Sequence, residues 1–177
     1  GIAKAYNEIG INYYYQADLE NAAEYFKIAS EKEAEMGNMT RAAAIIGNAS
    51  SIYHLSGNYP KALASAEKAL FIQEGLKDSV AIAGVLYNTA EIYYSQGTFE
   101  KAKTYYNRCL SYNIKDGVGY YFYALIGLAN LAREDKNYDK AIELYNESLT
   151  EFENAKNARM EGKVLNSIGA TYSDAQN

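Results

Sequence analysis

The chain has 177 residues, of which 49% are hydrophobic and 22% are charged, and its net charge at neutral pH is −5. This is the composition of a folded globular protein, and it excludes a disordered segment and a membrane-spanning bundle. The 17 Lys and Arg residues are scattered among 22 acidic residues without a basic cluster, so no nucleic-acid partner is expected.

The sequence repeats with a period close to forty residues. A turn followed by an alanine recurs at Ala22, Ala62, Ala102 and Ala141, with spacings of 40, 40 and 39 residues. Other positions form columns, meaning sets of equivalent residues in successive copies. One column is small: Gly10, Ser50, Ala90, Ala129 and Gly169. A second is large except in the fourth copy: Tyr13, Tyr53, Tyr93, Ala132 and Tyr172. A third is Tyr6, Ile46, Leu86, Leu125 and Leu165. Several columns with one period indicate an array of repeated units.

Each unit is predicted to be a helix, a tight turn and a second helix. In chain order the units span approximately 3–38, 43–78, 83–117 and 122–157, with a partial fifth unit over 162–177. The second helices are expected to end near Gly37, Lys77, Asp116 and Lys156. Because the sequence stops within a pattern that it repeats earlier, we expect a single array that is a fragment of a longer protein.

The residues around each turn explain how the second helices begin. A side chain able to accept from the free amides of the first helical turn precedes each of them: Asp18, Asn58, Thr98 and Asn137. Gly57 and Gly97 are placed to end the preceding helix in a left-handed conformation. Ala17 and Lys136 stand at this turn position in the first and fourth units.

No single hairpin can bury its apolar face alone, so neighbouring units must stack. The columns and the period resemble the tetratricopeptide repeat family in its longer, forty-residue variety, as found in bacterial signalling proteins and Pins-type adaptors. The resemblance covers essentially the whole chain. It implies an all-α, right-handed α-α superhelix of antiparallel hairpins that binds proteins and is not an enzyme. Ala17, Lys136 and Ala132 depart from the family pattern.

The resemblance also implies that the first helices line a concave groove, whose residues point away from the second helices. The positions expected there are Asn7, Ile11, Tyr14, Tyr15, Asn48, Ser51, His54, Leu55, Tyr87, Asn88, Glu91, Tyr94, Tyr123, Asn130, Arg133, Asn166 and Asp174. Amides can both donate to and accept from a peptide backbone, and tyrosines offer rigid contact area with a hydroxyl. In the alternative interpretation the amides hold neighbouring helices together and the tyrosines belong to the core.

Other kinds of site find little support. Arg133 and Lys163 are the only cations placed for a clamp on a terminal carboxylate, so chaperone-tail binding is not expected. A single histidine, His54, cannot supply a histidine-rich metal centre, and the sequence contains no metalloprotease, nucleophile-elbow or P-loop motif. Cys109 falls in a small-residue column and is expected to be a buried packing residue. No catalytic residue, metal or cofactor is predicted.

Three functions therefore compete. The first is a non-catalytic module that binds a peptide or partner protein in the groove, as the repeat region of a bacterial signalling protein. The second is a sensor of a small molecule or signalling peptide, and the third is a structural or oligomerisation spacer. The apolar face of the last helix, which includes Ile168 and Tyr172, is expected to cap the fourth unit or to self-associate. The expected compartment is the cytoplasm, with a periplasmic sensor region as the alternative.

Overall fold

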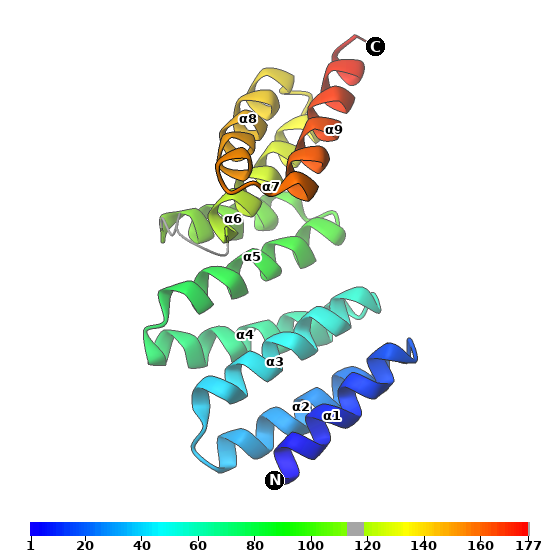
Figure 1. Cartoon of the computed structure of the whole chain (residues 1–177), viewed down its shortest axis with the longest axis vertical. Coiled ribbons are helices and arrows are strands. Elements are labelled where there is room, and N and C mark those ends of the chain that lie inside the picture. Colours follow the sequence, from blue (N-terminus) through cyan, green and yellow to red (C-terminus); the bar gives the residue numbers. More distant parts are fainter. Residues whose placement is uncertain (113–118, 177) are drawn as a thin grey trace.

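A computed structural model describes residues 1–112 and 119–176, and every regular element in these ranges is an α-helix (Figure 1). The helices are α1 (Ile2–Tyr15), α2 (Leu19–Glu35), α3 (Met39–Leu55), α4 (Tyr59–Leu76), α5 (Ser79–Ser95), α6 (Phe99–Ser111), α7 (Tyr120–Glu134), α8 (Tyr138–Asn154) and α9 (Ala158–Ala175). The all-α fold expected from the repeat is confirmed. The helix end expected near Asp116 lies outside the described residues.

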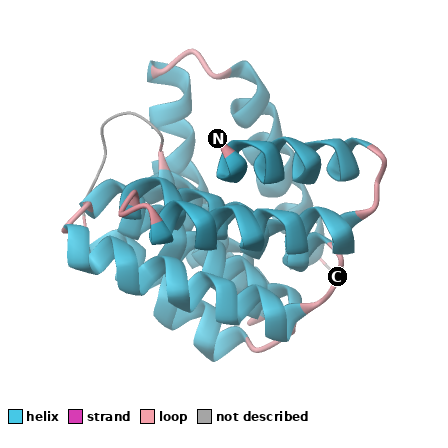
Figure 2. Cartoon of the chain, turned by 90° about the horizontal axis from the view of Figure 1, so that it is seen from below, coloured by secondary structure: helices cyan, strands magenta, loops and turns pink. Residues whose placement is uncertain are grey.

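The helices form antiparallel hairpins that stack along one axis, so the two termini lie at opposite ends of the molecule (Figure 1). The pairs α1 and α2, α3 and α4, α5 and α6, and α7 and α8 each pack together, and α9 packs on α8. Each hairpin also contacts the next one along the chain. Seen from below, successive hairpins are turned relative to one another, as in a solenoid (Figure 2).

Small residues allow the two helices of a hairpin to approach closely. A Cβ added at Gly10 in α1 would lie 3.2 Å from the carbonyl oxygen of Ala22 in α2. Ala22, Ala62, Ala102 and Ala141 are all fully buried, as their repetition at one position of the second helix requires. The small residues of both helices therefore bring the two helices of a hairpin close together.

The 19 tyrosines of the chain include both core and surface residues. Tyr53, Tyr106 and Tyr145 are at most 2% exposed and belong to the core, whereas Tyr15 is 81% exposed. A buried tyrosine needs a partner for its hydroxyl. The hydroxyl of Tyr53 donates a hydrogen bond to Glu24 at 2.6 Å, so this core tyrosine makes a polar contact in addition to its apolar ones.

Most of the predicted helix starts have the expected side-chain cap. Asp18, Asn58 and Asn137 accept hydrogen bonds from the backbone amides of Asn21, Lys61 and Lys140. Thr98 was expected to do the same for α6, and this prediction is wrong. Its hydroxyl donates instead to the carbonyl oxygen of Tyr93, at 3.0 Å, and so satisfies the end of α5 rather than the start of α6.

The turns within the hairpins use one left-handed residue each. Gly57 and Gly97 have φ angles of 73° and 71°, and Ala17 and Lys136 adopt 60° at the equivalent positions. Glycine adopts this region freely, whereas a residue with a Cβ is strained there by about 1–2 kcal/mol. The first and fourth hairpins therefore keep the geometry of the other two at a cost in stability.

We expect Lys136→Gly to stabilise the protein by about 0.5–1 kcal/mol, because relief of the left-handed strain exceeds the entropy that glycine adds to the unfolded chain. The matched control is Gly97→Ala at the equivalent turn, where a Cβ would meet no atom within 4 Å, so that only backbone strain changes. Chemical denaturation should show a gain for the first variant and a loss for the second. A loss for Lys136→Gly would mean that its side chain stabilises the turn.

The last helix packs through one of its faces and exposes another. Val164 is 1% exposed and Thr171 is fully buried in α9. Leu165 and Tyr172 lie in the columns of Ile46 and Tyr53, but each is 53% exposed. Helix α9 thus packs against the fourth hairpin, and the face that a second helix covers in earlier units is open. Self-association through this face stays a prediction.

Candidate binding groove

The first helices of successive hairpins lie next to one another and form one side of the array. Helix α3 contacts α5, and α5 contacts α7, in addition to the contacts within each hairpin. The residues of these helices that point away from the second helices therefore share one continuous surface. This is the surface on which the repeat pattern places its groove residues.

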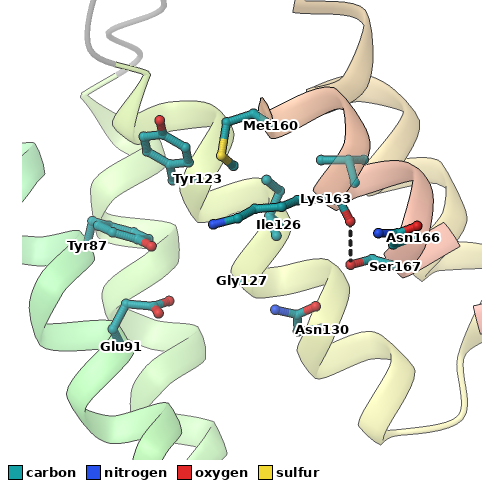
Figure 3. A pocket seen from close by; sticks show the side chains of 11 residues that line it. Tyr87, Glu91, Tyr123, Ile126, Gly127, Asn130, Met160, Lys163, Asn166 and Ser167 are labelled. Carbon is teal, nitrogen blue, oxygen red and sulfur yellow. Dashed lines mark hydrogen bonds between the residues drawn. The ribbon is translucent and has the colours of Figure 1, made fainter. Parts of the chain in front are cut away.

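A pocket of about 390 Å³ opens on this surface where α5, α7 and α9 meet (Figure 3). Its lining residues come from these three helices: Tyr87, Glu91, Tyr123, Ile126, Gly127, Asn130, Met160, Lys163, Val164, Asn166 and Ser167. A wider hollow of about 560 Å³ continues from it past Tyr120, Asn157 and Arg159. We call the two together the groove pocket. Its volume lies in the range typical of ligand sites, about 300–1,000 Å³.

The structure brings together some of the predicted groove residues and not others. Those that line the groove pocket are Tyr87, Glu91, Tyr123, Asn130 and Asn166. Those outside it are Asn7, Ile11, Tyr14, Tyr15, Asn48, Ser51, His54, Leu55, Asn88, Tyr94, Arg133 and Asp174. The predicted groove residues that line the groove pocket thus come from α5, α7 and α9.

The carboxylate of Glu91 lies in the groove pocket and is largely shielded from solvent. It accepts a very short hydrogen bond from the hydroxyl of Tyr106, which reaches it from α6. Burial raises the pKa of Glu91, and the hydrogen bond from Tyr106 opposes this rise. The pocket therefore contains an acceptor held in place by a buried tyrosine, and any group that donates to it gains from the low polarity of its surroundings.

Asn130 is held in the same way one unit later. Its side-chain oxygen accepts a very short hydrogen bond from the hydroxyl of Tyr145, which comes from α8. Asn130 follows Ala129 as Glu91 follows Ala90, and Tyr145 and Tyr106 are likewise equivalent. The contact with Tyr145 leaves the amide nitrogen of Asn130 as a donor in the pocket that also contains the acceptor on Glu91.

Three tyrosines form one wall of the groove pocket. The ring of Tyr87 lies 6.1 Å from that of Tyr120 and 5.9 Å from that of Tyr123, between ring centroids. Burial raises the pKa of Tyr87, so its hydroxyl stays protonated and can donate at neutral pH. On the opposite side, Lys163 extends from α9 toward the middle of the pocket, and Asn166 and Ser167 lie behind it (Figure 3).

Several other predicted groove residues connect neighbouring units. His54 in α3 lies 2.8 Å from the hydroxyl of Ser95 in α5, between its Nε2 and the Oγ. Arg133 in α7 pairs with Asp174 in α9 at 2.6 Å. Each contact joins a first helix to the first helix of the next unit, 41 residues further on. These side chains therefore connect neighbouring units of the array.

The sequence pattern misses several residues of the groove pocket, among them Ile126, Gly127, Met160, Val164 and Ser167. Gly127 is the one that shapes the packing beneath the pocket. It occupies the column of Asn48 and Asn88. A Cβ at this position would lie 2.3 Å from the Cζ of Tyr106, so the tyrosine ring rests directly on the glycine backbone. The replacement of two asparagines by a glycine was the available signal, because a large side chain often fills the space over a glycine inside a helix.

The structure also bears on the cysteine, on metal binding and on the membrane. Cys109 is 1% exposed, and burial raises the pKa of its thiol to about 12, as an inert packing residue requires. Within residues 1–112 and 119–176, no group of three or more His, Cys, Asp or Glu side chains is placed to hold a metal ion. No helix in these ranges is long and apolar enough to cross a membrane.

Comparison with known proteins agrees with the repeat pattern. Two family models, each described as tetratricopeptide repeat, match residues 41–113 and 87–156. Comparison with curated protein sequences finds no match.

Solved structures share the fold at low sequence identity. The apo form of RapI matches with a TM-score of 0.85 and 20% identity over 100% of this chain and 65% of that one. A STAND signal-transduction ATPase with a tetratricopeptide repeat sensor from Pyrococcus horikoshii matches with a TM-score of 0.82 and 23% identity over 96% of this chain and 27% of that one.

BtubC from P. vanneervenii matches with a TM-score of 0.73 and 20% identity over 88% of this chain and 64% of that one. The chain thus spans less than two thirds of each of these three proteins. The two family models together extend over residues 41–156, and the helical hairpins continue on both sides of that range. The chain belongs to the tetratricopeptide repeat family, whose fold is typically a non-catalytic interaction scaffold.

Proposed function

We propose that this chain is a non-catalytic interaction module, one array of repeats that binds a peptide segment of a partner protein in the groove pocket. The observation that carries the proposal is the pocket itself, where α5, α7 and α9 each contribute polar side chains to a partly apolar hollow. The structural likeness to RapI and to a STAND protein with a tetratricopeptide repeat sensor supports a role in signalling.

The side chains of the groove pocket suit an extended peptide. Asn166 can bond to backbone donors and acceptors, and the amide nitrogen of Asn130 can donate to backbone acceptors, regardless of the peptide sequence. Tyr87 and Tyr123 supply aromatic contact area at low entropic cost, as anchor residues of protein interfaces do. The carboxylate of Glu91 favours a peptide that places a hydrogen-bond donor or a positive charge between the tyrosines and α9.

The partner in this proposal is a protein, and neither nucleic acid nor a membrane is involved. We infer a cytoplasmic location, with the periplasmic region of a membrane-anchored protein as the alternative. Occupancy by a small molecule instead of a peptide would make the chain a sensor, and the experiment below separates these cases.

A display selection tests the proposal. Random peptides selected on the wild-type chain should bind it and should lose about tenfold or more in affinity for Lys163→Ala/Asn166→Ala, because exposed pocket residues then lose their contacts without unfolding the protein. The control is Lys68→Ala/Asn146→Ala, which changes the same residue types on the second helices and should bind as wild type does. Failure to enrich any peptide would favour a small ligand, and equal binding by the two double variants would place the peptide outside the groove pocket.

A further inference from the structure

A second pocket lies on a different face of α7 from the groove pocket. It has a volume of about 550 Å³ and is enclosed by α6, α7 and α8. Leu128, Leu131 and Leu144 contribute buried or half-buried apolar surface to it. Lys103, Asn107 and Lys140 are exposed at its borders. We call it the α6–α8 pocket. No residue that lines it also lines the groove pocket.

Comparison with the other units explains why this space is open. Ala132, which lines the α6–α8 pocket, occupies the column in which earlier units place Tyr13, Tyr53 and Tyr93. In the first and third units that tyrosine packs against a second tyrosine of the following helix. The ring centroids of Tyr13 and Tyr25 are 5.3 Å apart, and those of Tyr93 and Tyr105 are also 5.3 Å apart.

The fourth unit lacks both rings of this pair. Leu144 stands in the column of Tyr25 and Tyr105, and it too lines the α6–α8 pocket. The pocket is therefore lined by the residues that replace the two tyrosines of this pair. The apolar surface on which a ring would lie is retained, because leucines surround the vacant position.

The lysine that covers the tyrosine in the second and third units is retained as well. The Nζ of Lys61 lies 5.3 Å from the ring centroid of Tyr53, and that of Lys101 lies 5.2 Å from the ring centroid of Tyr93. Lys140 occupies the same column, directly before the buried alanine of its helix, and lines the α6–α8 pocket. Lysines at this distance attract the face of an aromatic ring.

We propose that the α6–α8 pocket binds a small phenol-type compound, whose aromatic ring takes the place of the tyrosine side chain that position 132 lacks. The ring lies against the leucines and beneath Lys140, as Tyr53 and Tyr93 lie beneath Lys61 and Lys101. Its hydroxyl group bonds to Lys103 or Asn107 at the border of the pocket. The volume of the pocket is within the range of small-molecule sites, about 300–1,000 Å³, and leaves room for further substituents.

The test uses 4-methylphenol, which is the tyrosine side chain as a free molecule. Ligand-observed NMR and calorimetry on the full chain should show saturable binding with one site. Ala132→Tyr restores the side chain of the other units, and it should weaken binding about tenfold or more because its own ring fills the pocket. Lys140→Ala should weaken binding about threefold or more through loss of the cation. The non-aromatic analogue 4-methylcyclohexanol should bind more weakly than 4-methylphenol.

Several results would overturn the proposal: no saturable binding to wild type, unchanged binding to a folded Ala132→Tyr variant, or equal binding of the two ring compounds. If Ala132→Tyr does not fold, Ala132→Leu fills part of the same space and must also weaken binding. N-acetyltyrosinamide should bind less well than 4-methylphenol, and the reverse would assign the pocket to a tyrosine of a partner peptide. The groove variant Lys163→Ala/Asn166→Ala should leave 4-methylphenol binding unchanged, which separates this inference from the proposed function.

Discussion

Gly127→Ala is expected to destabilise the protein by about 3 kcal/mol or more, at the upper end of the cost of overpacking a core. The added Cβ would lie 2.3 Å from the Cζ of Tyr106 and 2.4 Å from its Cε1. The ring cannot move aside easily, because Tyr106 is fully buried and its hydroxyl is bonded to Glu91. Accommodation of the methyl group therefore requires α6 and α7 to separate, which also distorts the groove pocket.

Gly47→Ala is the matched control for this substitution. Gly47 is also inside a first helix, α3, but a Cβ there would meet no atom within 4 Å. Alanine has the higher helix propensity, so this variant should gain about 0.5–1 kcal/mol. Thermal or urea denaturation of the two variants measures the difference. Equal stabilities would mean that the ring of Tyr106 is not packed on α7.

Tyr106→Phe is expected to cost about 1.5–3 kcal/mol, the usual contribution of a hydrogen bond to a charged group. The variant keeps the ring that packs on Gly127 but leaves the carboxylate of Glu91 without the tyrosine hydroxyl. Since that hydrogen bond favours the ionised carboxylate, its loss should raise the pKa of Glu91 further. Urea denaturation at several pH values, with carbon-13 NMR of the glutamate carboxyl, measures both effects. An unchanged stability would show that the contact contributes nothing.

The pH dependence of Glu91→Gln follows from the same carboxyl. Burial raises the pKa of Glu91 above its ordinary value of 4.5, so the folded state keeps this proton to higher pH than the unfolded state does. Through this group, the free energy of unfolding falls as the pH rises from 4.5 through the raised pKa. Glu91→Gln has no titrating carboxyl, so it does not lose this stability as the pH rises. It keeps an oxygen that accepts from Tyr106. It should therefore be more stable relative to wild type at pH 7 than at pH 4. The opposite trend would mean that the carboxylate is stabilised by its surroundings.

The repeat pattern predicts the architecture well, because the regular spacing of equivalent residues indicates an array of helical hairpins. Columns that repeat every 39 or 40 residues predict the helical hairpins and the tight turns within them, as the structure has them over residues 1–112 and 119–176. They even place the left-handed turns at Ala17 and Lys136, where the residue type argues against this conformation. Thr98 fails as a cap because its hydroxyl has a second acceptor, the carbonyl oxygen of Tyr93, within reach. Local sequence does not show whether this hydroxyl will cap α6 or bond to the end of α5.

The candidate site is less predictable, because it depends on contacts between distant residues. The sequence assigns Glu91 and Asn130 to the groove, but their fixed orientations come from Tyr106 and Tyr145 on other helices. The hollow at α5, α7 and α9 depends on Gly127, which the column analysis passes over. Ala132 is visible as a departure in the sequence. The space beside it becomes evident only when Leu144, the second replacement, is placed opposite it.

The account depends most on the claim that the groove pocket is where a partner binds, and hydrogen exchange with mass spectrometry tests this directly. The probe is a peptide recovered by display selection on the wild-type chain. We expect slower exchange in the segments of α5, α7 and α9 that line the pocket, centred on Tyr87, Tyr123 and Lys163, with little change in α2 and α4. Protection confined to the second helices, or to α1 and α3, would contradict the assignment of the binding site to the groove pocket.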